Sequence, residues 1–375
     1  MSKNLFGNLL KNENIFQAST IVEDLAVRVP QRDPFYCTSP TMSWGTAAGF
    51  QPGTMELLYG PKSSGKTMIV LDRIKQCQRI SKDTIQLFVD AELGFEFEST
   101  VKWMKVNGVD IERVAIIRQV CIKEIFEKTL LGEIQQELKA GNIQVDYIAM
   151  DSIQAMSVQN IPSTEKQIAS AVKNDGFTKG DYGARANYLA KIFPFFRMFC
   201  RDFRIFTTFV GQARSGGTDF HGNQIWTTNG GEALYHEVQY RQLVLPAGIP
   251  VFDELKSDAN GKPVQIGHRI KFTFEKNKMG EGHQRKGYFD IIYLKGIVNK
   301  EEELIVLCSK LNIVEIKGAW YYLADKKFNG SKQAAQFLID NPDEYQTLFN
   351  RMIMQSHTAP SEDIIFDKET GEIKE

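Results

Sequence analysis

The sequence has few cysteines, no excess of either charge and no long apolar run, and each shortage excludes a class of protein. The five cysteines are scattered and include no CxxC pair, which argues against a zinc site or a disulfide framework. Lysine and arginine number 45 against 46 acidic residues, so a polyanion would have to bind a local patch. No apolar run approaches about 18 residues and no signal peptide is recognisable, so we expect a cytoplasmic protein with no membrane contact.

The remaining composition is that of an ordinary globular protein, with 42% apolar and 24% charged residues over 375 positions. The chain divides into an N-terminal arm and linker (1–45), a core (46–296), a small C-terminal domain with the pattern of short helices (297–356) and an acidic tail (357–375). The tail has few bulky groups and is expected to be disordered. The amphipathic arm would pack either on its own core or on a neighbouring subunit.

One segment, Gly60–Thr67, has the GxxxxGK[ST] spacing of a phosphate-binding loop. It follows an apolar run and precedes residues with helical apolar spacing, so it joins a strand to a helix. Its glycines let successive N–H groups face phosphate oxygens. Lys66 would reach the β- and γ-phosphates, and the Thr67 hydroxyl would hold Mg²⁺. We therefore predict a nucleotide site whose ligands are Gly60, Pro61, Lys62, Ser63, Ser64, Gly65, Lys66 and Thr67.

Further along the chain, apolar runs with the composition of buried strands alternate with helical patterns. These runs are 84–89, 115–117, 147–150 and 205–210. The alternation predicts an α/β fold with a parallel, doubly wound sheet. In such a sheet the residues that contact a ligand lie just beyond the carboxyl ends of the strands.

Three polar residues occupy those predicted strand ends. Asp151 would hold Mg²⁺, directly or through water, or would simply cap the following helix. Glu92 would orient the attacking water as general base, or would be one exposed acid in an acidic loop. Gln212 is neutral and can therefore contact a γ-phosphate without a charge penalty, as a sensor of that group should.

Two long connections, 157–183 and 213–231, lack clear periodicity, and such segments are usually functional or mobile. Their cations, glycines and hydroxyls suit the backbone of single-stranded nucleic acid, although ordinary solvated loops remain the alternative. Trp226 would stack on a base or pack locally. The candidate nucleic-acid contacts are Lys166, Lys173, Lys179, Arg214, Trp226, Thr227, Thr228, Asn229, Gly230 and Gly231.

A predicted β-hairpin follows, formed by the alternating segments 268–274 and 287–293. Lys276 and Lys278 place two positive charges at one edge of it. By themselves these lysines would indicate no more than a solvated turn.

Taken in order from about residue 50 to 350, these motifs resemble those of the RecA family of homologous-recombination ATPases. Within that family the sequence resembles a divergent phage member of the UvsX type. Gly60–Thr67 is similar to the bacterial phosphate loop, and Lys276–Lys278 to lysines that reach the neighbouring subunit's ATP. The other segments that carry the resemblance are Val89–Glu92, Met150–Ser152, Gly211–Gln212, Thr227–Leu234, Gly318–Tyr321 and Asp340–Pro342.

The resemblance implies a RecA-type P-loop NTPase core with a mostly parallel central sheet, an N-terminal polymerisation arm and a small α/β C-terminal domain. It implies a DNA-dependent ATPase that uses ATP and Mg²⁺, forms a helical filament on single-stranded DNA and exchanges strands with a homologous duplex. A single-strand-binding protein and a loading mediator would be its partners. The implied catalytic residues are Lys66, Glu92, Gln212, Lys276 and Lys278. A hexameric helicase and a non-catalytic mediator remain alternatives, since fold alone does not separate them.

Overall fold

The computed structural model describes residues 32–47, 49–92, 98–158, 181–218, 220, 224–228, 231–257, 261–279, 285–293 and 295–356. The N-terminal residues 1–31 and the tail, 357–375, lie outside this set, so the predicted polymerisation arm and acidic tail are not described. Within the described residues no helix is long and apolar enough to span a membrane. The five cysteines are free and buried.

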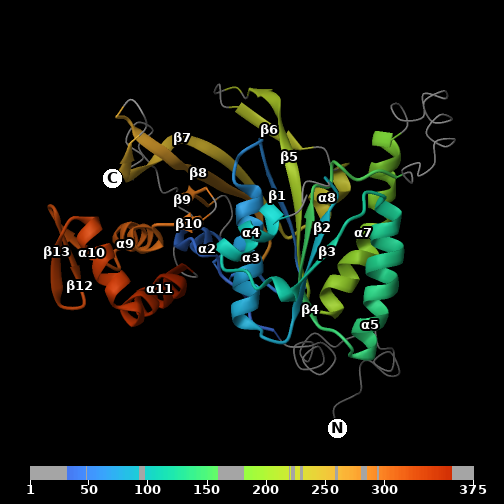
Figure 1. The fold of residues 1–375 in the computed structure, drawn as a ribbon, viewed down its shortest axis with the longest axis horizontal. Coiled ribbons are helices and arrows are strands. Elements are labelled where there is room, and N and C mark those ends of the chain that lie inside the picture. The colour runs from blue at the N-terminus through green and yellow to red at the C-terminus, as the bar shows by residue number, and fades with distance from the viewer. Residues whose placement is uncertain are drawn as a thin grey trace, which may run out of the picture.

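A 10-stranded sheet forms the centre of the molecule, in the order β10-β9-β8-β7-β1-β5-β4-β2-β3, with β6 paired to β5 outside this path (Figure 1). The pairs from β3 across to β7 are all parallel, and β8, β9 and β10 add an antiparallel edge. The strands are β1 (Met55–Gly60), β2 (Ile85–Asp90), β3 (Val114–Ile117), β4 (Val145–Asp151), β5 (Phe206–Thr218), β6 (Gln224–Thr228), β7 (Tyr240–Ser257), β8 (Pro263–Asn277), β9 (Lys286–Ile292) and β10 (Gly296–Val298).

Helices cover both faces of this sheet, as Figure 1 shows. One face carries a π-helix, η3 (Glu124–Ile134), which continues into α5 (Gln135–Ala140), together with α7 (Asp181–Asp202) and α8 (Gly231–Glu237). The other carries α2 (Pro40–Thr46), α3 (Lys66–Ile80), α4 (Glu98–Val106) and the 3₁₀ turn η2 (Ile111–Arg113). Each face has its own buried apolar cluster. The predicted mixed α/β class with a mostly parallel central sheet is therefore confirmed, and so is the hairpin, in which His268 pairs with Ile291.

A fully buried ion pair joins helix α3 to the sheet. Both oxygens of Glu56 on β1 accept hydrogen bonds from Arg73, with Arg73 Nη2 at 2.7 Å from Glu56 Oε1. Arg73 also donates to Gln242 Oε1 on β7 at 2.8 Å and to Thr208 Oγ1 on β5 at 3.2 Å. Removing one partner of such a pair costs about 3–5 kcal/mol, because the other charge stays buried. This network fixes α3, and so the loop that precedes it, relative to three strands.

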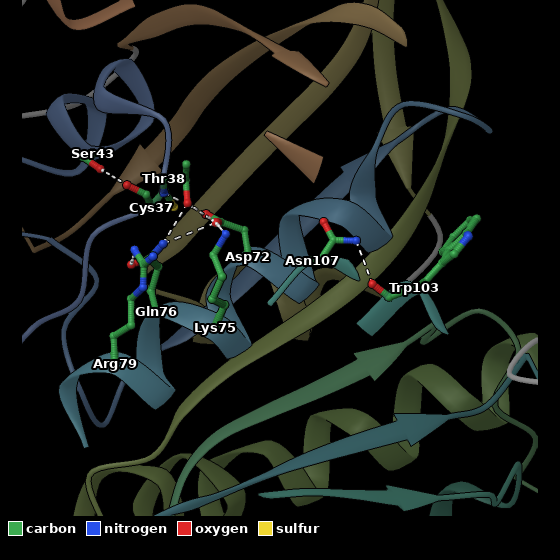
Figure 2. A network of polar contacts seen from close by, with 9 residues as sticks. All are labelled: Cys37, Thr38, Ser43, Asp72, Lys75, Gln76, Arg79, Trp103 and Asn107. Carbon is green, nitrogen blue, oxygen red and sulfur yellow. Dashed lines mark hydrogen bonds and ion pairs between the residues drawn. The ribbon is translucent and has the colours of Figure 1, made fainter. Parts of the chain in front are cut away.

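The segment before α2 is held against α3 by polar contacts (Figure 2). The backbone N–H of Thr38 donates to Asp72 Oδ2 at 2.8 Å, and the Thr38 hydroxyl also donates to this carboxylate. Gln76 donates to Thr38 Oγ1 at 2.8 Å, and Lys75 lies 3.6 Å from Asp72. The linker is therefore part of the packed core along this helix.

The small C-terminal domain has its own apolar cluster, to which Trp44 of α2 contributes. It contains α9 (Lys300–Lys310), the three-stranded sheet β11 (Glu315–Lys317), β12 (Trp320–Leu323) and β13 (Lys326–Asn329), then α10 (Ser331–Asp340) and α11 (Pro342–Ser356). The small α/β domain that the resemblance implied is therefore confirmed. The residue pattern alone, which indicated short helices, missed these strands because most of their residues are exposed and show no buried–exposed alternation.

Glu303 of α9 ties this domain to the start of α2. Its carboxylate accepts from the Thr41 backbone N–H at 2.7 Å and from the Ser39 and Thr41 hydroxyls. Burial raises the pKa of Glu303 to about 8 despite these donors. The C-terminal domain is thus attached to the core through a buried carboxyl group as well as through the packing around Trp44.

Candidate nucleotide and nucleic-acid site

The loop between β1 and α3 has the backbone of a phosphate cradle. Gly65, the N-cap of α3, has φ 79° and no side-chain cap, and Ser63 has φ 62°. The first N–H groups of this 15-residue helix therefore have no side-chain acceptor and can bind an anion. At Gly60 an added Cβ would lie 2.1 Å from Val244 O, so the close approach of β7 requires glycine there.

Lys66 lies over this loop. Its Nζ donates to the carbonyl oxygens of Gly60 at 3.0 Å and Pro61 at 2.7 Å. Desolvation lowers the pKa of Lys66, so the ammonium gains from any additional negative charge that comes within reach. Its position suits a phosphate group held by the loop.

Thr67, Asp151 and Glu92 meet at the adjoining strand ends. Thr67 Oγ1 lies 3.3 Å from Asp151 Oδ2, and the Ser152 hydroxyl donates to Glu92. The backbone N–H groups of Ala91 and Glu92 donate to Asp151 O at 2.9 and 3.3 Å, which holds the ends of β2 and β4 together. These contacts place a hydroxyl and two carboxylates beside the phosphate loop.

This set of oxygens fits Mg²⁺, which is held in phosphate sites by one or two protein oxygens plus phosphates and water. Burial, with repulsion from Glu92, raises the pKa of Asp151 to about 6. A divalent cation bound here would offset both the burial of the Asp151 carboxylate and its repulsion from Glu92. Among the described residues there is no group of three or more His, Cys, Asp or Glu side chains that could hold a metal ion.

Gln212 is brought next to the phosphate loop by strand pairing. In the parallel β1–β5 ladder Gln212 is the partner of Gly60, and its side chain is exposed. The structure therefore brings the predicted residues Lys66, Thr67, Glu92, Asp151 and Gln212 to one edge of the sheet. Four strands, β1, β2, β4 and β5, contribute to that edge.

The connection 213–231 differs from the sequence prediction, because its described part is not an irregular loop. β5 continues to Thr218 and pairs with β6 as an antiparallel hairpin, with Arg214 opposite Thr227 and Ser215 opposite Trp226. Ile225, Trp226 and the two threonines have high strand propensity, which the neighbouring glycines obscured. The hairpin projects beyond the phosphate-loop edge of the sheet (Figure 1).

The candidate DNA contacts occupy different positions on this hairpin. Arg214 and Thr227 are exposed, Trp226 is half-buried against the core cluster, and Thr228 is buried. Trp226 thus packs locally, and its stacking on a base stays a prediction. Gly231 begins α8. Lys166, Lys173, Lys179, Asn229 and Gly230 lie outside the described residues, as does most of the connection 157–183.

Lys276 and Lys278 lie at the end of β8, which is separated from β1 by β7. Lys276 Nζ donates to the carbonyls of Tyr235 at 2.5 Å and His236 at 3.1 Å, near the end of α8, and Lys278 is exposed. Desolvation, then repulsion from Lys278 and Arg241, lowers the pKa of Lys276 to about 8. Within one subunit Lys276 lies beside the end of α8, whereas Lys66 begins α3.

The sequence prediction missed a series of contacts that links β1, the strand before the phosphate loop, to the β5–β6 hairpin. Tyr59 donates to Glu275 Oε2 at 2.5 Å, and Arg241 Nε lies 2.8 Å from that oxygen. Arg241 stacks over the Tyr235 ring at 5.1 Å, and the Tyr235 hydroxyl bonds both the N–H and the C=O of Thr228 at 3.1 Å. No local pattern marks Tyr59 and Arg241, because their shared partner Glu275 is distant from both in the sequence.

The chain is similar in sequence to known proteins. A family model described as the RecA N-terminal domain matches residues 39–298. Protein RecA of Streptococcus mutans serotype c is 26% identical over 330 residues, which cover 88% of this chain and 78% of that protein. Protein RecA of Campylobacter lari is 30% identical over 298 residues (78% and 76%), and that of Leptospira meyeri 28% over 299 residues (79% and 67%).

Proposed function

The chain belongs to the RecA family, and from that premise we propose that it is an ATP-dependent recombinase that forms a helical filament on single-stranded DNA and exchanges strands with a homologous duplex. One observation carries the proposal. Strand β5 pairs with the phosphate loop at Gln212 and continues without a break into the exposed hairpin that bears Arg214. A single strand thus connects the nucleotide with a surface suited to DNA.

In the proposed reaction Glu92 orients the water that attacks the γ-phosphate of ATP. The Ser152 hydroxyl donates to Glu92 and so holds the carboxylate in place. Lys66 and the loop N–H groups stabilise negative charge on the transferred phosphoryl group. Mg²⁺, held by Thr67 and Asp151, would supply charge neutralisation at the β- and γ-phosphates. Gln212 contacts the γ-phosphate, and hydrolysis releases the DNA.

For the DNA itself we propose a surface made of the hairpin and the connection 157–183. Arg214 and Thr227 are cross-strand neighbours and both are exposed, so the two can contact adjacent phosphates. Lys166, Lys173 and Lys179 would add charge to the same surface. The protein would act in the cytoplasm, with a single-strand-binding protein and a loading mediator as partners.

Lys276 and Lys278 are proposed to reach the ATP of a neighbouring subunit, since identical subunits joined head to tail build a helical filament. Replacing both with methionine, which keeps the aliphatic stems, should lower DNA-stimulated ATP turnover by about 100-fold, the usual effect of losing charged groups that stabilise a phosphoryl transition state. Nucleotide binding by the isolated subunit should stay normal, measured by titration with a fluorescent ATP analogue. An equal loss of ATP turnover and of nucleotide binding would show that the lysines act within their own subunit.

The proposed function is tested by joint-molecule formation with ATP and Mg²⁺, using homologous and unrelated duplexes in parallel. Product with the homologous duplex alone is the expected result. Separation of strands in both duplexes would instead identify the helicase alternative. DNA-stimulated ATP turnover without any joint molecules, even after a single-strand-binding protein is added, would favour the mediator.

A further inference from the structure

Gln154 lies in the turn after β4, three residues beyond Asp151, and touches both strands of the hairpin base. Its Oε1 accepts from the Gln212 backbone N–H at 3.1 Å, and its Nε2 donates to Thr228 Oγ1 at 2.5 Å. We propose that Gln154 is a positioning residue that couples the nucleotide edge to the β5–β6 hairpin by holding Gln212 and Thr228 with one side-chain amide.

The orientation of this amide follows from its partners. A backbone N–H can only donate, so the atom facing Gln212 N must be the carbonyl oxygen of Gln154. The amide nitrogen then faces the Thr228 hydroxyl, whose oxygen accepts. Both halves of the side chain are therefore used, and neither a shorter nor an apolar side chain would satisfy both partners.

The turn that carries Gln154 is itself held rigidly. The Ile153 N–H donates to Val210 O on β5 at 3.1 Å, and the Ile153 side chain is fully buried. Arg185 at the start of α7 donates to the carbonyls of Gln154 at 2.8 Å and Met156 at 3.3 Å. The backbone that supports the amide is thus fixed on both sides, as a residue that transmits a displacement requires.

Gly211 provides the space for this contact. A Cβ there would lie 2.9 Å from Thr228 Oγ1 and 3.3 Å from Gln154 Nε2. A side chain at this position would therefore displace the Thr228 hydroxyl and crowd the Gln154 amide. The same residue precedes Gln212, so the close approach occurs at the position next to the proposed γ-phosphate contact.

This geometry gives the coupling a direction. When Gln212 shifts toward a γ-phosphate, its N–H pulls on an amide that is also bonded to Thr228. Thr228 is the pairing partner of Ala213, and its neighbour Thr227 pairs with Arg214, so the displacement reaches the exposed part of the hairpin. The inference deepens the proposed function and rests on it, since it assigns the link between ATP and the DNA surface.

The test compares Gln154→Met, which keeps the length but loses both hydrogen bonds, with Thr228→Val and the double variant. Exposed Gln144→Met is the matched control. DNA-stimulated kcat should fall by about tenfold in Gln154→Met, as expected for two lost hydrogen bonds. The KM for ATP and nucleotide binding without DNA should not change. The double variant should be no worse than Gln154→Met, because both substitutions remove one shared contact.

Unchanged stimulation in Gln154→Met, a parallel loss of ATP binding, or additive effects in the double variant would each overturn the inference. A second readout does not depend on DNA: the ATP-induced change in Trp226 emission, identified by subtraction of Trp226→Phe, should disappear in Gln154→Met and persist in Gln144→Met. If wild-type protein shows that change but no DNA-stimulated turnover, the proposed function fails while the coupling stands. If the emission change in Gln154→Met is as large as in the wild type, the coupling is rejected and the proposed function is unaffected.

Discussion

Replacing Lys66 with alanine should reduce ATP turnover by at least about 100-fold, because a cation that stabilises a transferred phosphoryl group is worth several kcal/mol in a water-poor site. In the structure the Lys66 ammonium lies 2.7 Å from Pro61 O and 3.0 Å from Gly60 O, inside the loop rather than in solvent. The measurement is phosphate release at saturating ATP and single-stranded DNA.

Exposed Lys82 offers a matched control, since Lys82→Ala removes the same charge beyond the other end of α3. Lys82→Ala should keep wild-type turnover. Near-normal turnover in Lys66→Ala would mean that the nucleotide binds elsewhere, and the assignment of Gly60–Thr67 would have to be abandoned.

The second large effect concerns Glu92. Glu92→Gln should lower hydrolysis by about 10²–10⁴-fold, the usual contribution of a positioned general base. The amide keeps an oxygen that can accept from Ser152, so the loop should hold its shape. ATP binding should therefore survive, and the variant should remain on single-stranded DNA after ATP is added instead of dissociating.

Two measurements decide this: single-turnover hydrolysis, and dissociation of the protein from a labelled single strand. Glu112→Gln, at an exposed position in η2, is the control for loss of one carboxylate. If Glu92→Gln hydrolyses ATP at the wild-type rate, Glu92 is only an exposed acid. If it loses ATP binding as well, Glu92 supports the site and does not orient the water.

The parts of the site that could be predicted are those encoded locally. Gly60–Thr67 could be found because its spacing is sufficient to define the loop. Asp151 and Glu92 could be found because each lies just beyond an apolar run. Where several short-range signals compete, the prediction failed. The glycines at 216 and 217 obscured the β5–β6 hairpin, and the exposed strands β11–β13 have no alternating pattern.

Gln154 shows why the remaining features could not be predicted. A single glutamine after a strand has no motif, and its significance comes from Gln212 and Thr228, which lie 58 and 74 positions away. The contact between Tyr59 and Glu275 likewise joins β1 to β8, which are far apart in the sequence. Such contacts depend on strand order, which periodicity does not specify.

The central position of β1 also has a consequence for synthesis of the chain. Glu56 pairs with Thr208 on one side and with Tyr240 on the other, so both neighbours of the phosphate-loop strand are made long after it. Closing such long loops is slow, and a nascent chain that ends before β7 leaves one side of β1 unpaired. An unpaired apolar strand is a template for association with other chains. During translation this protein therefore passes through a stage in which β1 is open to pairing with other chains.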